Sequence, residues 1–145
     1  MDGVEAADTM IFEHQERWWM LTNLRPEGCA DFYSRLYAFH ADSPISTNWN
    51  PHDLNSILID AEGGRNGGLL RDSDGALHRV GQNQGMTVYG ESFSLFRIDE
   101  LTPTTYQESL VRTVQSDLFD DQIGGHHMHA ADTCTVFDLI KWESV

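Results

Sequence analysis

The feature that most constrains this chain is a series of short β-rich runs separated by clusters of Gly, Asn, Asp and Pro, with no long helical period. This pattern is typical of antiparallel sheets, in which short strands alternate with tight turns. The strongest turn signal is Asp72-Ser73-Asp74-Gly75, because Asp-Gly readily supplies positive φ angles. The sequence therefore predicts an all-β fold.

The runs fall into groups of four, four and two, in units at about residues 6–60, 67–115 and 124–142. Each four-strand unit takes roughly 50 residues, the size of one propeller blade. We therefore expect residues 1–145 to form a single partial β-propeller domain of about two and a half four-stranded antiparallel blades. A five-strand barrel or a β-sandwich would give a similar rhythm. The glycine pairs 63–64, 67–68 and 124–125 are predicted to be turns.

The charge of the chain excludes two classes of partner. The formal net charge is −14, from 23 acidic and nine basic residues. Binding to nucleic acid or to an anionic membrane needs clustered Lys and Arg, so a neutral or cationic ligand is expected instead. No apolar run is long enough to cross a bilayer, and no signal peptide is evident, so we expect a cytoplasmic protein. Cys29 and Cys134 are expected to be ordinary free thiols.

Several strings, taken in order, carry a resemblance to a known family. They are "DTMIFEHQERWWMLT" (8–22), "LYAFHADSP" (36–44), "WNPHDLNSI" (49–57), the segment 74–108 with its "VYGES" and "LTPTTYQE" parts, and "GGHHMHAADTCTVFD" (124–138). Their order and spacing resemble the N-terminal domain of plant glucosamine inositolphosphorylceramide transferases and of bacterial relatives. The resemblance implies a five-bladed propeller, similar in fold to glycoside hydrolases of the arabinanase type.

The chain departs from that family in length and at two motifs. The family's propeller is about twice as long, so only its later blades are expected. The string "GGRNGG" (63–68) stands where the family usually has an Arg-Pro-Ala-Gly turn, and "HHMH" (126–129) replaces a His-Thr pair. An incomplete ring leaves strand edges exposed, and such edges pair with other chains. We therefore expect a homodimer.

The resemblance assigns Asp8 to the innermost strand of a blade, where its carboxylate would face the central cavity. Glycoside hydrolysis needs two carboxyl groups at a defined separation. Glu91 is the expected catalytic partner of Asp8, and Asp138 is an alternative that is also expected to bind ligand. Asp8 can equally be an acid that caps a turn.

The same resemblance implies that Arg65, Arg79 and Gln82 line the cavity and bind ligand, together with Tyr89. An arginine suits carboxylate or phosphate groups because its guanidinium binds them in a bidentate manner. In so acidic a chain, an arginine can equally be a structural counter-ion.

The tract His126-His127-Met128-His129 offers two kinds of site. On a strand, His127 and His129 would share one face and His126 would lie on the other. These two histidines with a carboxylate such as Asp132 could bind a divalent metal. Alternatively, His127 or His129 contacts a ligand without metal, and we expect no obligatory cofactor. Trp18 and Trp19 point to opposite faces, and one of them is expected in the core.

Three functions remain open from the sequence. The first is a carbohydrate-binding or carbohydrate-processing protein that recognises a sugar or a small polar ligand. The second is a non-catalytic oligomeric interaction module, and the third is a small metal-binding protein that uses residues 126–129. Only half of the family's cavity lining is expected in this chain. Ligand binding tolerates such a loss more easily than a catalytic acid/base pair does, so the shortened ring argues against catalysis.

Overall fold

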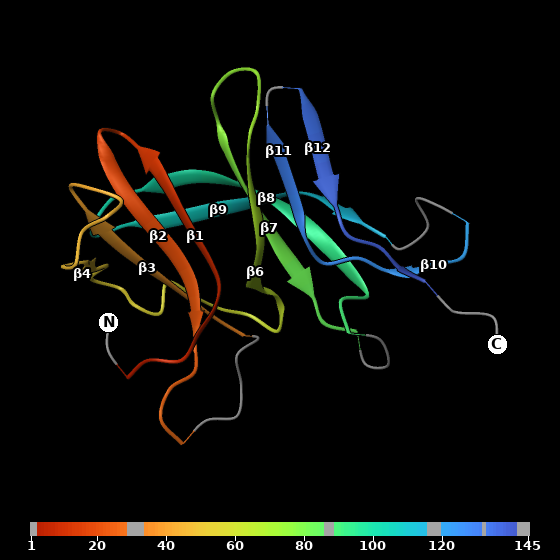
Figure 1. Cartoon of the computed structure of the whole chain (residues 1–145), viewed down its shortest axis with the longest axis horizontal. Helices are drawn as coiled ribbons and strands as arrows, with labels where there is room; N and C mark the ends of the chain where they lie inside the picture. Colours follow the sequence, from red (N-terminus) through yellow and green to blue (C-terminus); the bar gives the residue numbers. More distant parts are fainter. Residues whose placement is uncertain (1–2, 29–33, 86–88, 116–119, 132, 142–145) are drawn as a thin grey trace.

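A computed structural model describes residues 3–28, 34–85, 89–115, 120–131 and 133–141 (Figure 1). Across these residues the regular structure consists of antiparallel β-strands, so the all-β prediction is confirmed. None of the described segments is a helix that could span a bilayer.

The first sheet contains the strands predicted for the N-terminal unit, in the order β1-β2-β3-β4, with β5 also paired to β3. Its strands are β1 (Ala6–His14), β2 (Arg17–Leu24), β3 (Arg35–Ala41), β4 (Asn50–Pro51) and β5 (Leu58–Ile59). Gln15 and Glu16 alone form the first turn, with φ angles of 51° and 59°. Two successive positive φ angles match the twist of a tight two-residue hairpin, which explains why β1 and β2 pair directly.

The second sheet is a four-stranded meander in the order β6-β7-β8-β9. Its strands are β6 (Glu62–Arg71), β7 (Leu77–Asn83), β8 (Ser92–Leu101) and β9 (Tyr106–Val114). The turn predicted at residues 72–75 joins β6 to β7. The N–H of Gly75 donates to the carbonyl of Asp72 at 3.0 Å, and Gly75 has a φ of 84°. The predicted Asp-Gly turn is therefore confirmed.

The C-terminal segment forms two small sheets, β10-β13 and β11-β12. The strands are β10 (Gln122–Gly124), β11 (Met128–Ala131), β12 (Cys134–Phe137) and β13 (Ile140–Lys141). β11 and β12 correspond to the hairpin predicted from the sequence. The pairing of β10 with β13 is an additional contact that brings the two ends of this segment together.

β6 is the central strand of the molecule. It contacts β1 of the first sheet on one side and β11 of the C-terminal hairpin on the other, as Figure 1 shows. The first strands of the first two sheets and β11 of the C-terminal hairpin therefore meet at one place. The described residues do not close into a ring of blades.

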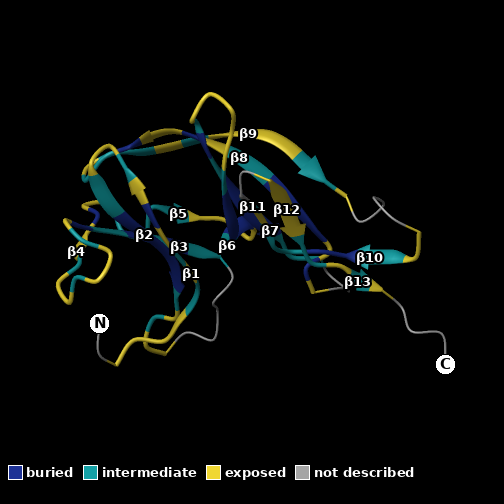
Figure 2. Ribbon diagram, turned by 45° about the horizontal axis from the view of Figure 1, so that its top comes forward, coloured by how far each residue is buried: buried dark blue, intermediate teal, exposed yellow. Residues whose placement is uncertain are grey.

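The main hydrophobic core lies between the first two sheets. Its buried members are Phe12, Trp19, Leu21, Leu36, Ala38, Leu69, Leu77, Ile98 and Leu101. Trp19 is one of them, and Trp18 is only half-buried, as expected for neighbours on opposite faces of a strand. Burying one large apolar side chain contributes about 1.5–3 kcal/mol, so this interface holds the two sheets together. In Figure 2 the buried positions concentrate along β2 and β6, whereas β9 is largely exposed.

The prediction that glycine pairs 63–64 and 67–68 form turns is wrong, because both pairs lie within β6. A Cβ on Gly67 or Gly68 would collide with the backbone carbonyl oxygens of His126 and Met128, respectively. A Cβ on Gly64 would collide with the carbonyl of Asp60. These glycines permit close backbone approach rather than chain reversal. The third pair, 124–125, does not form a turn either, since Gly124 is the last residue of strand β10.

Gly67→Ala tests this explanation. Because Gly67 is not among the residues with positive φ, an alanine there meets only the steric conflict with the carbonyl of His126. We expect the free energy of unfolding, measured with urea, to fall by about 1–3 kcal/mol or more. Gly75→Ala is the control for backbone strain alone, because Gly75 has open space around it but a φ of 84°, which alanine disfavours. Equal destabilisation of the two variants would contradict the steric argument.

Candidate functional site

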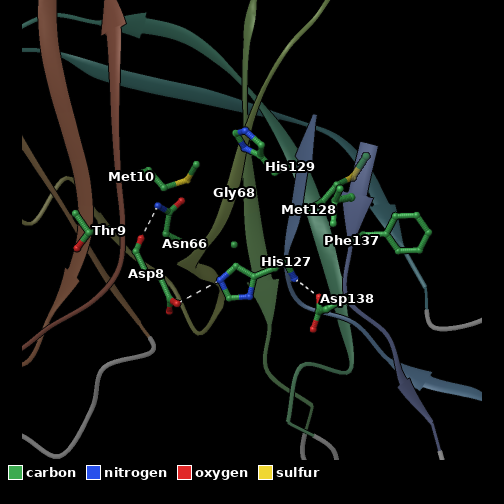
Figure 3. Close-up of a pocket in the computed structure, with 12 residues that line it drawn as sticks. Asp8, Thr9, Met10, Asn66, Gly68, His127, Met128, His129, Phe137 and Asp138 are labelled. Carbon is green, nitrogen blue, oxygen red and sulfur yellow. Dashed lines mark hydrogen bonds and ion pairs between the residues drawn. The ribbon is translucent and has the colours of Figure 1, made fainter. Parts of the chain in front are cut away.

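A cavity of about 320 Å³ opens between β1, β6 and the β11–β12 hairpin. The side chains that line it form a polar group and an apolar group (Figure 3). The polar group contains Asp8, Thr9, Asn66, His127, His129 and Asp138, and the apolar group contains Met10, Met128, Val136 and Phe137. The cavity therefore lies where the first strands of the first two sheets and β11 meet.

A β-bulge in β1 sets the position of Asp8. Asp8 and Thr9 together oppose Thr22 on β2, and Asp8 has a φ of 51°. Aspartate is one of the few non-glycine residues that tolerate this left-handed conformation, and bulges often redirect side chains at functional sites. The hydroxyls of Thr9 and Thr22 are 2.7 Å apart, which ties the bulge to β2.

Asp8 is the centre of a charged cluster. Its Oδ2 accepts a hydrogen bond from Nε of Arg65 at 2.6 Å, and its Oδ1 lies 3.3 Å from Nε2 of His127. The side chains of Asp8 and Arg65 are only 15% and 12% exposed. Three separate strands or loops thus bring one acid and two basic groups together at one wall of the cavity.

These contacts shift the ionisation of both partners. Burial raises the pKa of Asp8, but its hydrogen bonds with His127 and Arg65 outweigh this effect, so the pKa is lowered below 3.8. The hydrogen bond to Asp8 raises the pKa of His127 above 6.5, despite the opposing effect of burial. Asp8 is therefore ionised at neutral pH, and His127 holds its proton more strongly than an isolated histidine does.

A second cluster surrounds Asp138. Its Oδ1 accepts hydrogen bonds from the backbone N–H groups of His126 at 2.9 Å and His127 at 2.6 Å. Its Oδ2 makes an ion-pair contact with Nδ1 of His126. The ring of Tyr89 meets His126 edge-on, with centroids 5.0 Å apart, and the guanidinium of Arg65 lies 5.5 Å from the Tyr89 ring. Tyr89 therefore connects the two clusters.

The predicted alternation within the histidine tract is wrong for His126. β11 begins only at Met128, so His126 and His127 precede the strand. The alternation of faces holds only inside a strand. The rings of His126 and His127 instead contact each other, with centroids 4.7 Å apart. His129 is exposed and lines the cavity wall, and Asp132 lies outside the described residues.

The structure does not bring Arg79 into the cavity. Its side chain is completely buried and forms two hydrogen bonds to the carboxylate of Glu108, at 2.8 and 2.6 Å. It also donates to the carbonyl of Gly63 at 2.8 Å and packs over the ring of Phe96. Burial of the guanidinium is possible only because Glu108 neutralises it, so Arg79 is the counter-ion that the sequence allowed as an alternative.

Gln82 and Glu91 also lie away from the cavity lining. Gln82 is buried, and its Nε2 donates to the carbonyl of Asn66 at 2.8 Å, so it supports the cavity wall from behind. Glu91 is exposed and borders a separate hollow with Asp60 and Glu62. The expected catalytic pairing of Asp8 with Glu91 is therefore absent from the cavity that holds Asp8, whereas Asp138, the alternative partner, lines the same cavity.

Asn66 is a site residue that the sequence did not reveal. It is fully buried, and its Nδ2 donates to the carbonyl of Asp8 at 2.9 Å. Its backbone N–H donates to the side chain of Asn23, which in turn donates to the carbonyl of Gly64. The only signal in the sequence is a polar residue between two glycine pairs, where strand packing is unusually close.

A family profile described as "Glucosamine inositolphosphorylceramide transferase 1, N-terminal" matches residues 4–137. This match covers all but the ends of the chain, including every residue of the two clusters except Asp138. The chain belongs to this family. No solved structure matches the chain significantly.

Two relatives in the family are plant proteins called glucosamine inositolphosphorylceramide transferase 1. The one from Arabidopsis thaliana is 32% identical over 103 residues, which cover 70% of this chain and 13% of that protein. The one from Oryza sativa subsp. japonica is 29% identical over 103 residues, which cover 70% and 14%. The matched part is therefore a small portion of each relative's length.

The Asp8–His127 pair predicts a specific pH dependence in chelator-treated, metal-free protein. In Asp8→Asn, the pKa of His127 should fall towards 6.5, because the largest cause of its elevation is lost. NMR titration of the imidazole measures this pKa, and His14 in the same spectrum is the internal control. Arg65, His126 and Asp138 also face His127, and the substitution does not replace them. An unchanged His127 pKa would contradict the contact.

The same pair contributes to stability with a defined sign. A raised histidine pKa contributes stability that is complete below the unfolded value of 6.5 and is lost as the pH rises through the folded-state pKa. The stability advantage of the wild type over Asp8→Asn should therefore shrink as the pH rises through that range. The part of this stability advantage that comes from the Asp8–Arg65 ion pair should remain, since arginine keeps its charge throughout that pH range.

Proposed function

We propose that the cavity between β1, β6 and the β11–β12 hairpin is a carbohydrate-binding site. The observation that carries this proposal is Asn66, whose buried Oδ1 has no hydrogen-bond partner among the described residues while the residue lines the cavity. A buried acceptor of this kind is costly unless a donor reaches it. A sugar hydroxyl in the cavity is such a donor.

The rest of the lining suits a sugar ring. Sugars present apolar C–H faces and polar hydroxyl edges, and the cavity offers both kinds of partner. Met10, Met128 and Phe137 supply apolar surface, while Asp8 and His127 supply charged hydrogen-bonding groups. Ligand sites commonly combine a largely apolar lining with a few fixed polar groups. A neutral polar ligand also agrees with the acidic character of the chain.

We propose binding rather than hydrolysis. A glycosidase needs a general acid with a raised pKa, and the pKa of Asp8 is lowered by its contacts with His127 and Arg65. The other expected catalytic acid, Glu91, borders a different hollow. The named activity of the plant relatives concerns proteins of which this match covers 13–14%, so we propose a sugar-recognition role for the domain rather than the transferase reaction.

The arrangement of strands around β6 supports a relationship between this fold and a β-propeller. We propose that the two large sheets and the C-terminal hairpin are consecutive blades, with β1, β6 and β11 as their innermost strands. Such strands line the central cavity of a propeller, which agrees with the location of Asp8, Asn66 and Met128 around one cavity.

A glycan array followed by NMR titration of hits tests the binding proposal. Asp8→Asn should weaken binding of the best glycan at least tenfold, because it removes a charged hydrogen-bond acceptor from the cavity. Glu91→Gln is the matched control, since it removes a carboxylate outside the cavity, and it should leave affinity unchanged. Equal loss in both variants, or no binding to any glycan, would argue against the proposal.

We also propose a homodimer in which β9 contributes to the interface. β9 is the edge strand of its sheet and exposes Leu110 and Val111, which are 61% and 56% accessible. Edge strands with exposed apolar residues are prone to pair with a second chain. Size-exclusion chromatography with light scattering should give twice the monomer mass of 16.4 kDa, and Leu110→Lys should give the monomer. A wild-type monomer would exclude this arrangement.

A further inference from the structure

We propose that His126, His127 and Asp138 form a binding site for a first-row divalent cation, with Zn²⁺ as the best match. One ligand atom from each of these three side chains lies within 4.8 Å of the others. Two imidazoles and one carboxylate are a donor set suited to zinc and its first-row neighbours, whereas Ca²⁺ and Mg²⁺ prefer oxygen ligands.

Asp138 is already oriented for this role. Its Oδ1 accepts hydrogen bonds from the backbone N–H groups of His126 and His127, which fixes the carboxylate against the irregular segment before β11. Its Oδ2 faces Nδ1 of His126 instead of the backbone. One oxygen therefore holds the carboxylate in place, and the other is directed at the first imidazole of the proposed site.

His127 has the arrangement usual for a metal-binding histidine. Its Nε2 faces Oδ1 of Asp8 at 3.3 Å, and in Figure 3 its second ring nitrogen lies on the side of Asp138. Metal-ligating histidines commonly donate their other ring N–H to a carboxylate, which fixes the ring and makes it a better ligand. Asp8 would therefore act as a positioning residue for the second imidazole.

Packing also fixes the position of His126. Tyr89 meets its ring edge-on at 5.0 Å, and the ring of His127 lies 4.7 Å away. A Cβ on Gly90 would come within 2.8 Å of the Cβ of His126, so only glycine at position 90 allows this placement. The ring is therefore held near Asp138 without any ligand, which lowers the cost of ordering the site.

The proposed site adjoins the cavity, because His127 and Asp138 also line it. Three protein ligands leave at least one position open on a four-coordinate ion, for water or for a ligand hydroxyl. This inference does not depend on carbohydrate binding, since it concerns affinity for the cation alone.

Titration of the chelator-treated 145-residue chain with Zn²⁺ against a competing indicator tests the proposal. We expect one Zn²⁺ per chain, with affinity reduced more than tenfold in His126→Gln and in Asp138→Asn. Asp8→Asn should reduce affinity tenfold to a hundredfold, as is typical when a carboxylate behind a metal-ligating histidine is lost. Circular dichroism of each variant establishes whether it is folded. If Asp138→Asn does not fold, His126→Gln still decides the test.

His129→Gln is the matched control, because His129 belongs to the same tract but lies outside the three-residue group. The affinity of the His129→Gln variant for Zn²⁺ should equal that of the wild type. Co²⁺ should give visible absorption without a thiolate charge-transfer band, which separates this site from binding by the exposed Cys134. Absence of stoichiometric binding, equal loss in His129→Gln, or a thiolate band that disappears in Cys134→Ser would each overturn the proposal.

Discussion

The close approach of β6 to the strands on both sides is the constraint on which the rest of the structure depends. β6 contacts β1 and β11, and Gly67 and Gly68 of the "GGRNGG" string lack the side chains that would collide with the backbone at His126 and Met128. Because Gly67 and Gly68 face the carbonyls of His126 and Met128, the histidine tract lies directly against β6. The site is thus a consequence of how closely the backbones pack.

Buried polar side chains determine the relative position of the sheets with more precision than the apolar core could. Asn23 on β2 hydrogen-bonds to Gly64 and Asn66 on β6, and Asn66 hydrogen-bonds to the carbonyl of Asp8 on β1. Leaving any of these groups unpaired in the interior would be costly, so only one alignment of β1 with β6 satisfies all of them. That alignment is also the one that places Asp8 beside Arg65.

Local chemistry in the sequence was sufficient to predict the strands and several site residues. Asp-Gly predicted the turn after β6. The site candidates named from the sequence include Asp8, Arg65, Tyr89, His127 and Asp138, which the structure brings into contact. The sequence could not choose between a ligand-binding and a counter-ion role for Arg79, since its burial depends on Glu108, which is 29 positions away in the chain. The prediction failed for the glycine pairs because a glycine needed for close packing resembles a glycine needed for a turn.

The sequence by itself determined the antiparallel strands, the acidic character and the membership of the family described by the N-terminal domain of glucosamine inositolphosphorylceramide transferase 1. These properties depend on composition, on local alternation and on residues near one another in the chain. Only the tertiary structure decided that His126, rather than His129, joins His127 and Asp138, and that Glu91 lies apart from Asp8. The physical reason is that β-bulges and close glycine contacts redirect side chains, and the two-residue period of a strand cannot reveal either of them.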